Sequence, residues 1–150
     1  MDKRICLDTN IFIAFFCNEP GHKQANTLFS KLLEDHYRIL MPALVNFEIA
    51  NVLAKKEKMG LLTEQDSKQS LQKFATFPIL LVWQTEYLEQ AMELQRKNLA
   101  TVFDASYLAT AKANQIPLIT EDQEMIRRGK KIHPAIYTTR EWLEIEQGSE

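Results

Sequence analysis

The stretch Arg4-Ile5-Cys6-Leu7-Asp8-Thr9-Asn10 opens the chain and decides how the rest of it is organised. Its apolar part predicts a buried strand that delivers Asp8 to the strand's carboxyl end. Ligands bind beside the carboxyl ends of the strands in open parallel α/β sheets, so an acid at this point is a candidate for chemistry. Asp8 is also a good N-cap for a helix that begins near Asn10, and this stretch alone leaves both roles open.

Length and composition predict one soluble domain over residues 1–147, followed by a disordered tail at 148–150. The chain has 150 residues, of which 45% are hydrophobic and 25% charged, enough for a hydrophobic core. No apolar run approaches the roughly 18 residues that cross a bilayer, and no leader sequence opens the chain, so we expect a cytoplasmic protein. Cys6 and Cys17 lack the spacing of metal ligands or of a disulfide scaffold and are expected to be buried, reduced thiols.

Charge and motif content exclude several classes of function. The net charge of −2 argues against a general nucleic-acid coat protein. It is compatible with a nuclease, because acids concentrated at a metal site offset basic surface elsewhere. The four glycines form no phosphate loop or dinucleotide fingerprint, the three histidines lack the spacing of a zinc site, and no Gly-x-Ser-x-Gly elbow is present.

Short apolar runs alternate with longer helical patterns along the chain. After the first strand, strands are predicted at 37–41, 79–82, 117–120 and 135–137. Helices are predicted at 11–16, 22–34, 43–58, 63–77, 85–97, 103–113, 122–128 and 139–146. This alternation predicts an α/β fold with a mostly parallel sheet. The run 79–82 is apolar without alternation, which predicts a strand that is covered on both faces.

Glu48 lies on the apolar face of the predicted helix 43–58. At about 100° per residue it falls between Leu44 and Val52 on the helical wheel. An ionised carboxylate turned toward a core costs several kcal/mol unless a cation or several donors meet it. The alternative is a glutamate at the edge of the apolar face that reaches a nearby lysine or arginine.

Two further acids occupy comparable places. Asp104 shares the inward face of its helix with Tyr107 and Leu108, although an acid in a first turn is also favoured by the helix dipole. Asp122 follows the predicted strand 117–120 after one residue, at the carboxyl end of a strand, where it could equally cap the next helix.

Four acids at one edge of a sheet would repel one another if nothing neutralised them. Mg²⁺ or Mn²⁺ resolves this repulsion, because hard divalent ions prefer oxygen ligands and bind through a few carboxylates while they retain water. Such an ion activates water and neutralises charge on a phosphoryl oxygen. Phosphodiester hydrolysis is therefore the reaction class that the cluster predicts.

Four segments together resemble the PIN domain, and particularly the VapC-type toxins of bacterial and archaeal toxin–antitoxin pairs. They are 7–10 (LDTN), 47–53 (FEIANVL), 103–109 (FDASYLA) and 118–122 (LITED). The resemblance implies a three-layer α/β/α fold with four or five strands and a Mg²⁺- or Mn²⁺-dependent endoribonuclease. It also implies a homodimer and a small antitoxin that inserts into the active-site groove.

The resemblance carries over to individual residues of this sequence. It implies that Asp8, Asp104 and Asp122 hold metal, and that Glu48 positions or deprotonates the attacking water. Matching polar positions that support these acids are Thr9, Asn10 and Thr120. RNA would be gripped by local positive charge, for which the candidates, all open to the alternative of ordinary solvated helix ends, are Lys55, Lys56, Lys58, Arg96, Lys97, Arg127, Arg128, Lys130 and Lys131.

Two other functions remain open from the sequence. A binding module could hold RNA or a partner protein without cutting. A phosphatase could form an aspartyl-phosphate on Asp8, although such enzymes usually place a second aspartate two positions on, where this chain has Asn10. The apolar residues Phe74, Phe77 and Leu88 are open both as dimer contacts and as core.

Overall fold

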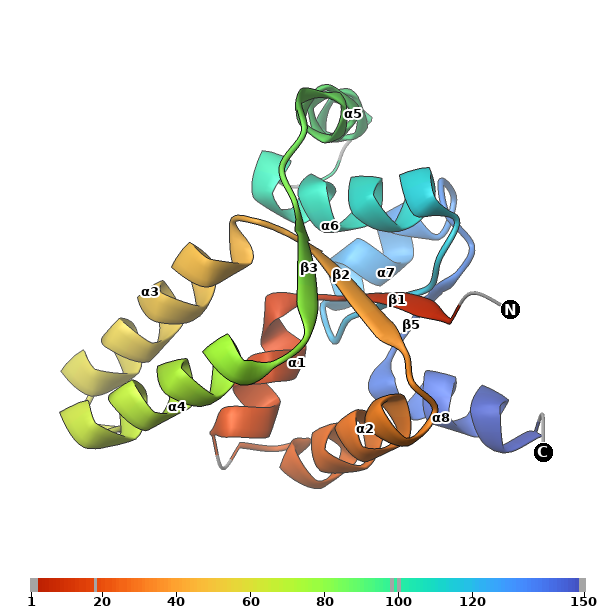
Figure 1. Cartoon of the computed structure of the whole chain (residues 1–150). Coiled ribbons are helices and arrows are strands. Elements are labelled where there is room, and N and C mark those ends of the chain that lie inside the picture. The colour runs from red at the N-terminus through yellow and green to blue at the C-terminus, as the bar shows by residue number, and fades with distance from the viewer. Residues whose placement is uncertain (1–2, 18, 98, 100, 149–150) are drawn as a thin grey trace.

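The computed structural model describes residues 3–17, 19–97, 99 and 101–148, and its centre is a parallel sheet (Figure 1). Five strands pair in the order β3-β2-β1-β4-β5, every neighbouring pair parallel. Their bounds are β1 Arg4–Leu7, β2 Arg38–Pro42, β3 Ile79–Val82, β4 Leu118–Ile119 and β5 Ile136–Tyr137. The predicted α/β fold with a parallel sheet is confirmed.

Eight helices lie in the described part of the chain. Their bounds are α1 Thr9–Phe16, α2 His22–Glu34, α3 Val45–Lys58, α4 Glu64–Thr76, α5 Thr85–Arg96, α6 Val102–Asn114, α7 Gln123–Gly129 and α8 Thr139–Gly148. None of the helices described here is long and apolar enough to span a membrane. Of the predicted tail, Gly148 ends α8, and 149–150 lie outside the described residues.

The helices cover the sheet on two sides. α6 packs on β1, β2 and β4 and carries α5 on its outer side, while α2 packs against α1 and α8. Figure 1 shows α5 and α6 on one side of the sheet and α1, α2 and α8 on the other, with α3 and α4 running side by side away from it. The three-layer arrangement leaves the central strand β1 covered on both faces.

Burial explains why β1 occupies the middle of the sheet. Ile5, Cys6 and Leu7 are all fully buried, as expected for a strand that is covered from both sides. Cys6 and Cys17 are buried free thiols, as predicted. On the α1 side, a cluster of phenylalanine rings fills the space between α1, α2 and the end of α4, with its members Phe12, Phe15, Phe16, Phe29, Phe74 and Phe77 in contact ring to ring.

The predicted burial of the run 79–82 on both faces is wrong. β3 is the edge strand of the sheet, and the exposed fractions of Leu80 and Leu81 are 52% and 40%. An unbroken apolar run is shared by covered interior strands and by edge strands that need a partner, so periodicity alone does not separate them. Of the three residues left open, Phe74 is buried, Phe77 is half-buried in the phenylalanine cluster, and Leu88 is exposed.

Candidate active site

Asp8 stands where β1 ends and α1 begins, and it fills both roles that its position allows. It is the N-cap of α1, and its Oδ1 accepts a hydrogen bond of 2.7 Å from the backbone N–H of Thr9. Its Oδ2 accepts from the hydroxyl of Thr120 at 2.7 Å and from the side-chain amide of Asn10 at 3.3 Å. Only 7% of Asp8 is exposed.

The environment of Asp8 raises the pKa of its carboxyl group above the value that the group has in water. Burial is the largest cause and raises the pKa of Asp8 to about 7, with smaller contributions from the charges of Glu48 and Asp104. The hydrogen bonds from Thr120 and Thr9 act in the opposite direction. The three carboxylates therefore share one electrostatic environment, although they come from the cap of α1, from α3 and from α6.

Glu48 lies in the first turn of α3 and is half-buried, on the inward face that its sequence position predicts. The phenol of Tyr107 donates a 2.6 Å hydrogen bond to its Oε1, and the hydroxyl of Thr9 donates at 3.4 Å. Tyr107 and Thr9 are also in hydrogen-bond contact with each other. Among the described residues, the partners of Glu48 are thus hydroxyl groups, and not the lysine or arginine of the alternative arrangement.

The pKa of Glu48 is raised by burial, with a smaller contribution from the charge of Asp104, and is lowered by the hydrogen bonds from Tyr107 and Thr9. Burial and the nearby carboxylates also raise the pKa of the Tyr107 phenol, so this group stays protonated and serves as a donor. Tyr107 was not among the predicted site residues. The signal that could have found it is its spacing of three from Asp104, which places both on one face of α6.

Asp104 and Asp122 form the other half of the cluster. Asp104 sits in the first turn of α6, where its backbone N–H donates to the cap hydroxyl of Thr101 at 3.0 Å. Burial, and then the charge of Asp122, raise the pKa of Asp104. Both acids line one small crevice together with Glu124 and Arg128. Asp122 also caps α7, because its Oδ1 accepts from two backbone N–H groups of that helix.

Thr120 connects the two halves of the cluster. Its hydroxyl donates to Asp8 and accepts from the backbone N–H of Asp122 at 3.1 Å. The amide of Asn10 donates to the same hydroxyl at 3.5 Å, and its carbonyl accepts from the backbone N–H of Glu121 at 3.4 Å. Thr9, Asn10 and Thr120 therefore all contact a predicted acid or its immediate backbone.

The donor set fits a hard divalent cation. All four acids offer carboxylate oxygens, and their mutual repulsion is the cost that a cation would remove. Within the residues that the structure describes, no three carboxylate, imidazole or thiol groups are already arranged as a cage around an ion. Carboxylate oxygens are the ligands of an ion such as Mg²⁺, which is held by one or two carboxylates and keeps several of its waters.

Most of the basic residues predicted to bind RNA form ion pairs with carboxylates of the protein itself. Ion pairs join Lys56 to Glu19, Lys97 to Glu93 and Lys130 to Glu141. Arg127 and Arg128 both pair with Glu124, at 2.8 and 3.0 Å. Five of the nine candidate cations are therefore partly neutralised on the folded protein.

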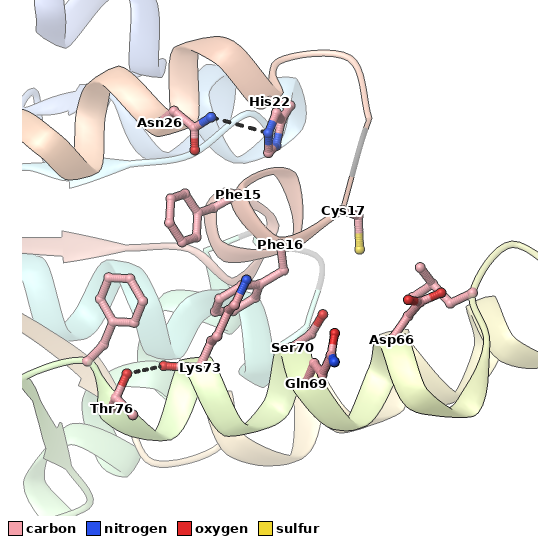
Figure 2. Close-up of a pocket in the computed structure, with 12 residues that line it drawn as sticks. Phe15, Phe16, Cys17, His22, Asn26, Asp66, Gln69, Ser70, Lys73 and Thr76 are labelled. Atoms are coloured by element: carbon pink, nitrogen blue, oxygen red, sulfur yellow. Dashed lines mark hydrogen bonds between the residues drawn. The ribbon is translucent and has the colours of Figure 1, made fainter.

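A large cavity lies away from the acids. It measures about 540 Å³ and lies between α1, α2 and α4. Figure 2 shows the rings of Phe15 and Phe16 between polar side chains of α2, such as His22, and polar side chains of α4, such as Lys73. None of the four acids lines it, so charge and burial, not cavity size, single out the acidic site.

Comparison with known proteins places the chain in a family. Residues 5–131 match the PIN domain. The chain is 29% identical over 137 residues to Ribonuclease VapC3 of Pyrobaculum aerophilum, covering 90% of this chain and 98% of that protein. A crystal structure of a protein from the same organism superimposes with a TM-score of 0.67 at 24% identity, covering all of this chain and 92% of that one. A toxin–antitoxin complex from Klebsiella pneumoniae matches with a TM-score of 0.54 at 25% identity, covering 90% and 97%. This chain belongs to the PIN domain family.

Proposed function

We propose that the protein is a metal-dependent endoribonuclease that cleaves RNA phosphodiester bonds and acts as the toxin of a toxin–antitoxin pair. The observation that carries the proposal is a hydrogen-bond network that joins the four separate segments carrying the acids. Thr120 bonds both Asp8 and the backbone of Asp122. Tyr107, one turn along α6 from Asp104, bonds Glu48. The similarity to Ribonuclease VapC3 supports RNA as the substrate.

The chain's own groups divide the work of hydrolysis. Asp8 and Asp104 would hold the principal ion, and Asp122 would contribute to it or to a second one. A bound Mg²⁺ or Mn²⁺ supplies positive charge that activates water and stabilises the phosphoryl oxygens. Glu48, fixed by the phenol of Tyr107, orients the attacking water and accepts its proton. Attack in line at phosphorus breaks the P–O3′ bond, and the leaving 3′-oxygen takes a proton from solvent, which leaves a 5′-phosphate and a 3′-hydroxyl.

The proposed assembly has two kinds of protein partner. A small antitoxin would block the active-site groove, which the toxin–antitoxin complex from Klebsiella pneumoniae among the structural neighbours supports. A second copy of the chain would cover the exposed apolar surface at the sheet edge, which consists of Leu80, Leu81, Trp83, Leu88 and Met92. The cytoplasm, where RNA is available, is the proposed compartment.

Cleavage of labelled RNA tests the proposal. The purified chain is expected to cut in the presence of Mg²⁺ or Mn²⁺ and to stop when EDTA is added. Asp8→Asn and Asp104→Asn should each reduce the rate at least about 100-fold, because each removes charge from the centre that stabilises the transition state. Glu89→Gln, which changes an exposed acid of α5, is the matched control and should cut like the wild type.

The chemistry of the product ends separates two mechanisms. A 5′-phosphate and a 3′-hydroxyl indicate attack by water, as proposed. A 2′,3′-cyclic phosphate formed equally well in EDTA would show that the RNA's own 2′-hydroxyl attacks, and the metal mechanism would be wrong. RNA that is retained without cuts under all conditions would favour the binding module.

A further inference from the structure

Three aromatic side chains remain exposed on the folded protein. The chain has fourteen phenylalanine, tyrosine and tryptophan residues, all within the described ranges. Eleven are buried or half-buried, whereas the exposed fractions of Phe47, Trp83 and Phe103 are 81%, 75% and 62%. Burial of an aromatic ring is stabilising because it removes apolar area from water. A ligand or partner that covers one of these exposed rings would gain that stabilisation.

Two of these rings stand next to the acidic cluster. Phe47 immediately precedes Glu48 in the first turn of α3, and Phe103 immediately precedes Asp104 in the first turn of α6. Tyr107, one turn along α6 from Asp104, donates a 2.6 Å hydrogen bond to Glu48, so the first turns of α3 and α6 lie close together in the fold. Trp83 differs from these two, because it belongs to the apolar surface at the sheet edge proposed above as the dimer contact.

The surroundings of Phe47 do not resemble a protein interface. The residues one turn further along the same face of α3, Ala50 and Asn51, are small or polar and exposed. A single ring beside small or polar side chains is smaller than the contiguous apolar patches that mark protein contacts. It does match a stacking site for a nucleobase, since every base presents an aromatic face of similar size.

The charge distribution adds a second reason to expect base contacts. The four acids repel the phosphate backbone, and five of the candidate basic side chains are already paired with carboxylates. Contacts to phosphate are therefore weakened at these five side chains, and contacts of another kind would add to the affinity for RNA. Stacking of bases on aromatic rings is sequence-tolerant and needs no positive charge.

We propose that Phe47 and Phe103 are base-stacking residues that hold unpaired bases of the RNA next to the phosphate addressed by Glu48 and Asp104. The inference rests on the proposed ribonuclease function and narrows its substrate to single-stranded or looped RNA. Paired bases are stacked on their neighbours and do not offer a free face, so duplex RNA is excluded from these two sites. Binding should also depend only shallowly on salt, because few phosphate contacts contribute to it.

Binding in EDTA tests the proposal without any need for cleavage. The probe is a short single-stranded RNA that carries the fluorescent base 2-aminopurine, whose emission falls when it stacks on an aromatic ring. The wild type should quench the probe, and Phe47→Leu and Phe103→Leu should each weaken binding about tenfold, the loss of one stacked base. Phe47→Trp should retain both affinity and quenching. The same RNA annealed into a duplex should bind at least about tenfold more weakly.

The control variants distinguish base stacking from a general apolar contact. Leu33→Ala removes an exposed apolar side chain from α2 and should leave binding unchanged. Leucine keeps the apolar character of the position, so a protein contact would largely survive Phe47→Leu. The proposal is overturned if both leucine variants bind and quench like the wild type, if the wild type does not bind the probe, or if duplex RNA binds as well as single strands. Wild-type binding and quenching without cleavage in Mg²⁺ would instead contradict the proposed nuclease and leave stacking intact.

Discussion

The buried Asp8 carboxyl group, which we propose as a metal ligand, lowers the stability of the fold when it is ionised. Its pKa of about 7 in the fold lies far above the ordinary value of 3.8, because the group is buried near other carboxylates. Between about pH 4 and 7, the folded protein keeps a proton that the unfolded chain has lost. The folded state therefore binds more protons in this window, and the free energy of unfolding falls as the pH rises.

Asp8→Asn removes this pH-dependent penalty. In metal-free buffer near pH 8 the variant should unfold at higher urea concentration than the wild type, with a gain of up to roughly 4 kcal/mol set by the two pKa values. Near pH 3 the two proteins should be about equally stable, because Asp8 is largely protonated in both states. Urea denaturation at the two pH values measures the difference. A variant less stable than the wild type near pH 8 would show that burial of the charge is not costly.

A divalent metal ion should reduce the destabilisation that the ionised Asp8 carboxylate causes. An ion that binds the folded acids and not the unfolded chain stabilises the fold by mass action. Mg²⁺ or Mn²⁺ is therefore expected to raise the melting temperature of the wild type near pH 8 and to have little effect on Asp8→Asn. Thermal unfolding with and without the ion measures this. Equal shifts in both proteins would place the ion elsewhere.

Tyr107 is expected to act by positioning Glu48. Tyr107→Phe removes the 2.6 Å hydrogen bond to the carboxylate and leaves the longer one from Thr9. Hydrogen bonds to charged groups contribute about 1.5–3 kcal/mol, so kcat should fall about tenfold or more while KM stays nearly constant. Tyr87→Phe, which removes a hydrogen bond from Asn114 far from the acids, is the control. A rise in KM at unchanged kcat would assign Tyr107 to substrate binding.

At the scale of elements, helix α1 connects the site to the hydrophobic core. Asp8 caps its start, and the ring of Phe12 packs against Phe29 of α2, Phe74 of α4 and Phe77 just beyond α4. Phe12→Ala should lower the free energy of unfolding by about 3–5 kcal/mol, measured by urea denaturation, because it opens a cavity among rings that cannot close it. The exposed Phe103 provides the control, since Phe103→Ala should change stability by less than about 0.5 kcal/mol. Equal losses would mean that the cluster does not hold the helices together.

The elements show how far sequence patterns reach. The bounds predicted for α2, 22–34, agree with the structure, because its apolar residues recur at helical spacing on one face. The positions of the acids could be predicted from the sequence, because strand ends and helical phase determine where a side chain points. The hydroxyl partners of the acids could not be predicted, since the contact of Tyr107 with Glu48 depends on how α3 and α6 pack. For β3, an apolar run predicts a strand but not its place in the sheet.

At the scale of the whole molecule, strand order is what gathers the site. β1 lies between β2 and β4, so the segments that follow these three strands leave the sheet at the same edge. Asp8 follows β1, the helix that carries Glu48 follows β2, and Asp122 follows β4. α6 packs across these three strands and adds Asp104 from above them. A parallel sheet thus joins residues that are more than a hundred positions apart in the chain.

The same strand order places β3 at one edge of the sheet, where no further strand of the described chain pairs with it. The outer side of an edge strand offers unpaired backbone groups, and here the adjoining side chains of β3 and α5 are apolar as well. A second copy of the chain would cover both, so the wild type should elute as a dimer in size-exclusion chromatography with light scattering.

Leu88→Glu should shift it to monomer, because a charge buried in an apolar contact is costly. Leu33→Glu is matched in exposure, at 53% against 51%, but lies on α2 and should remain dimeric. A wild type that is monomeric at all concentrations tested would leave this edge without its proposed partner.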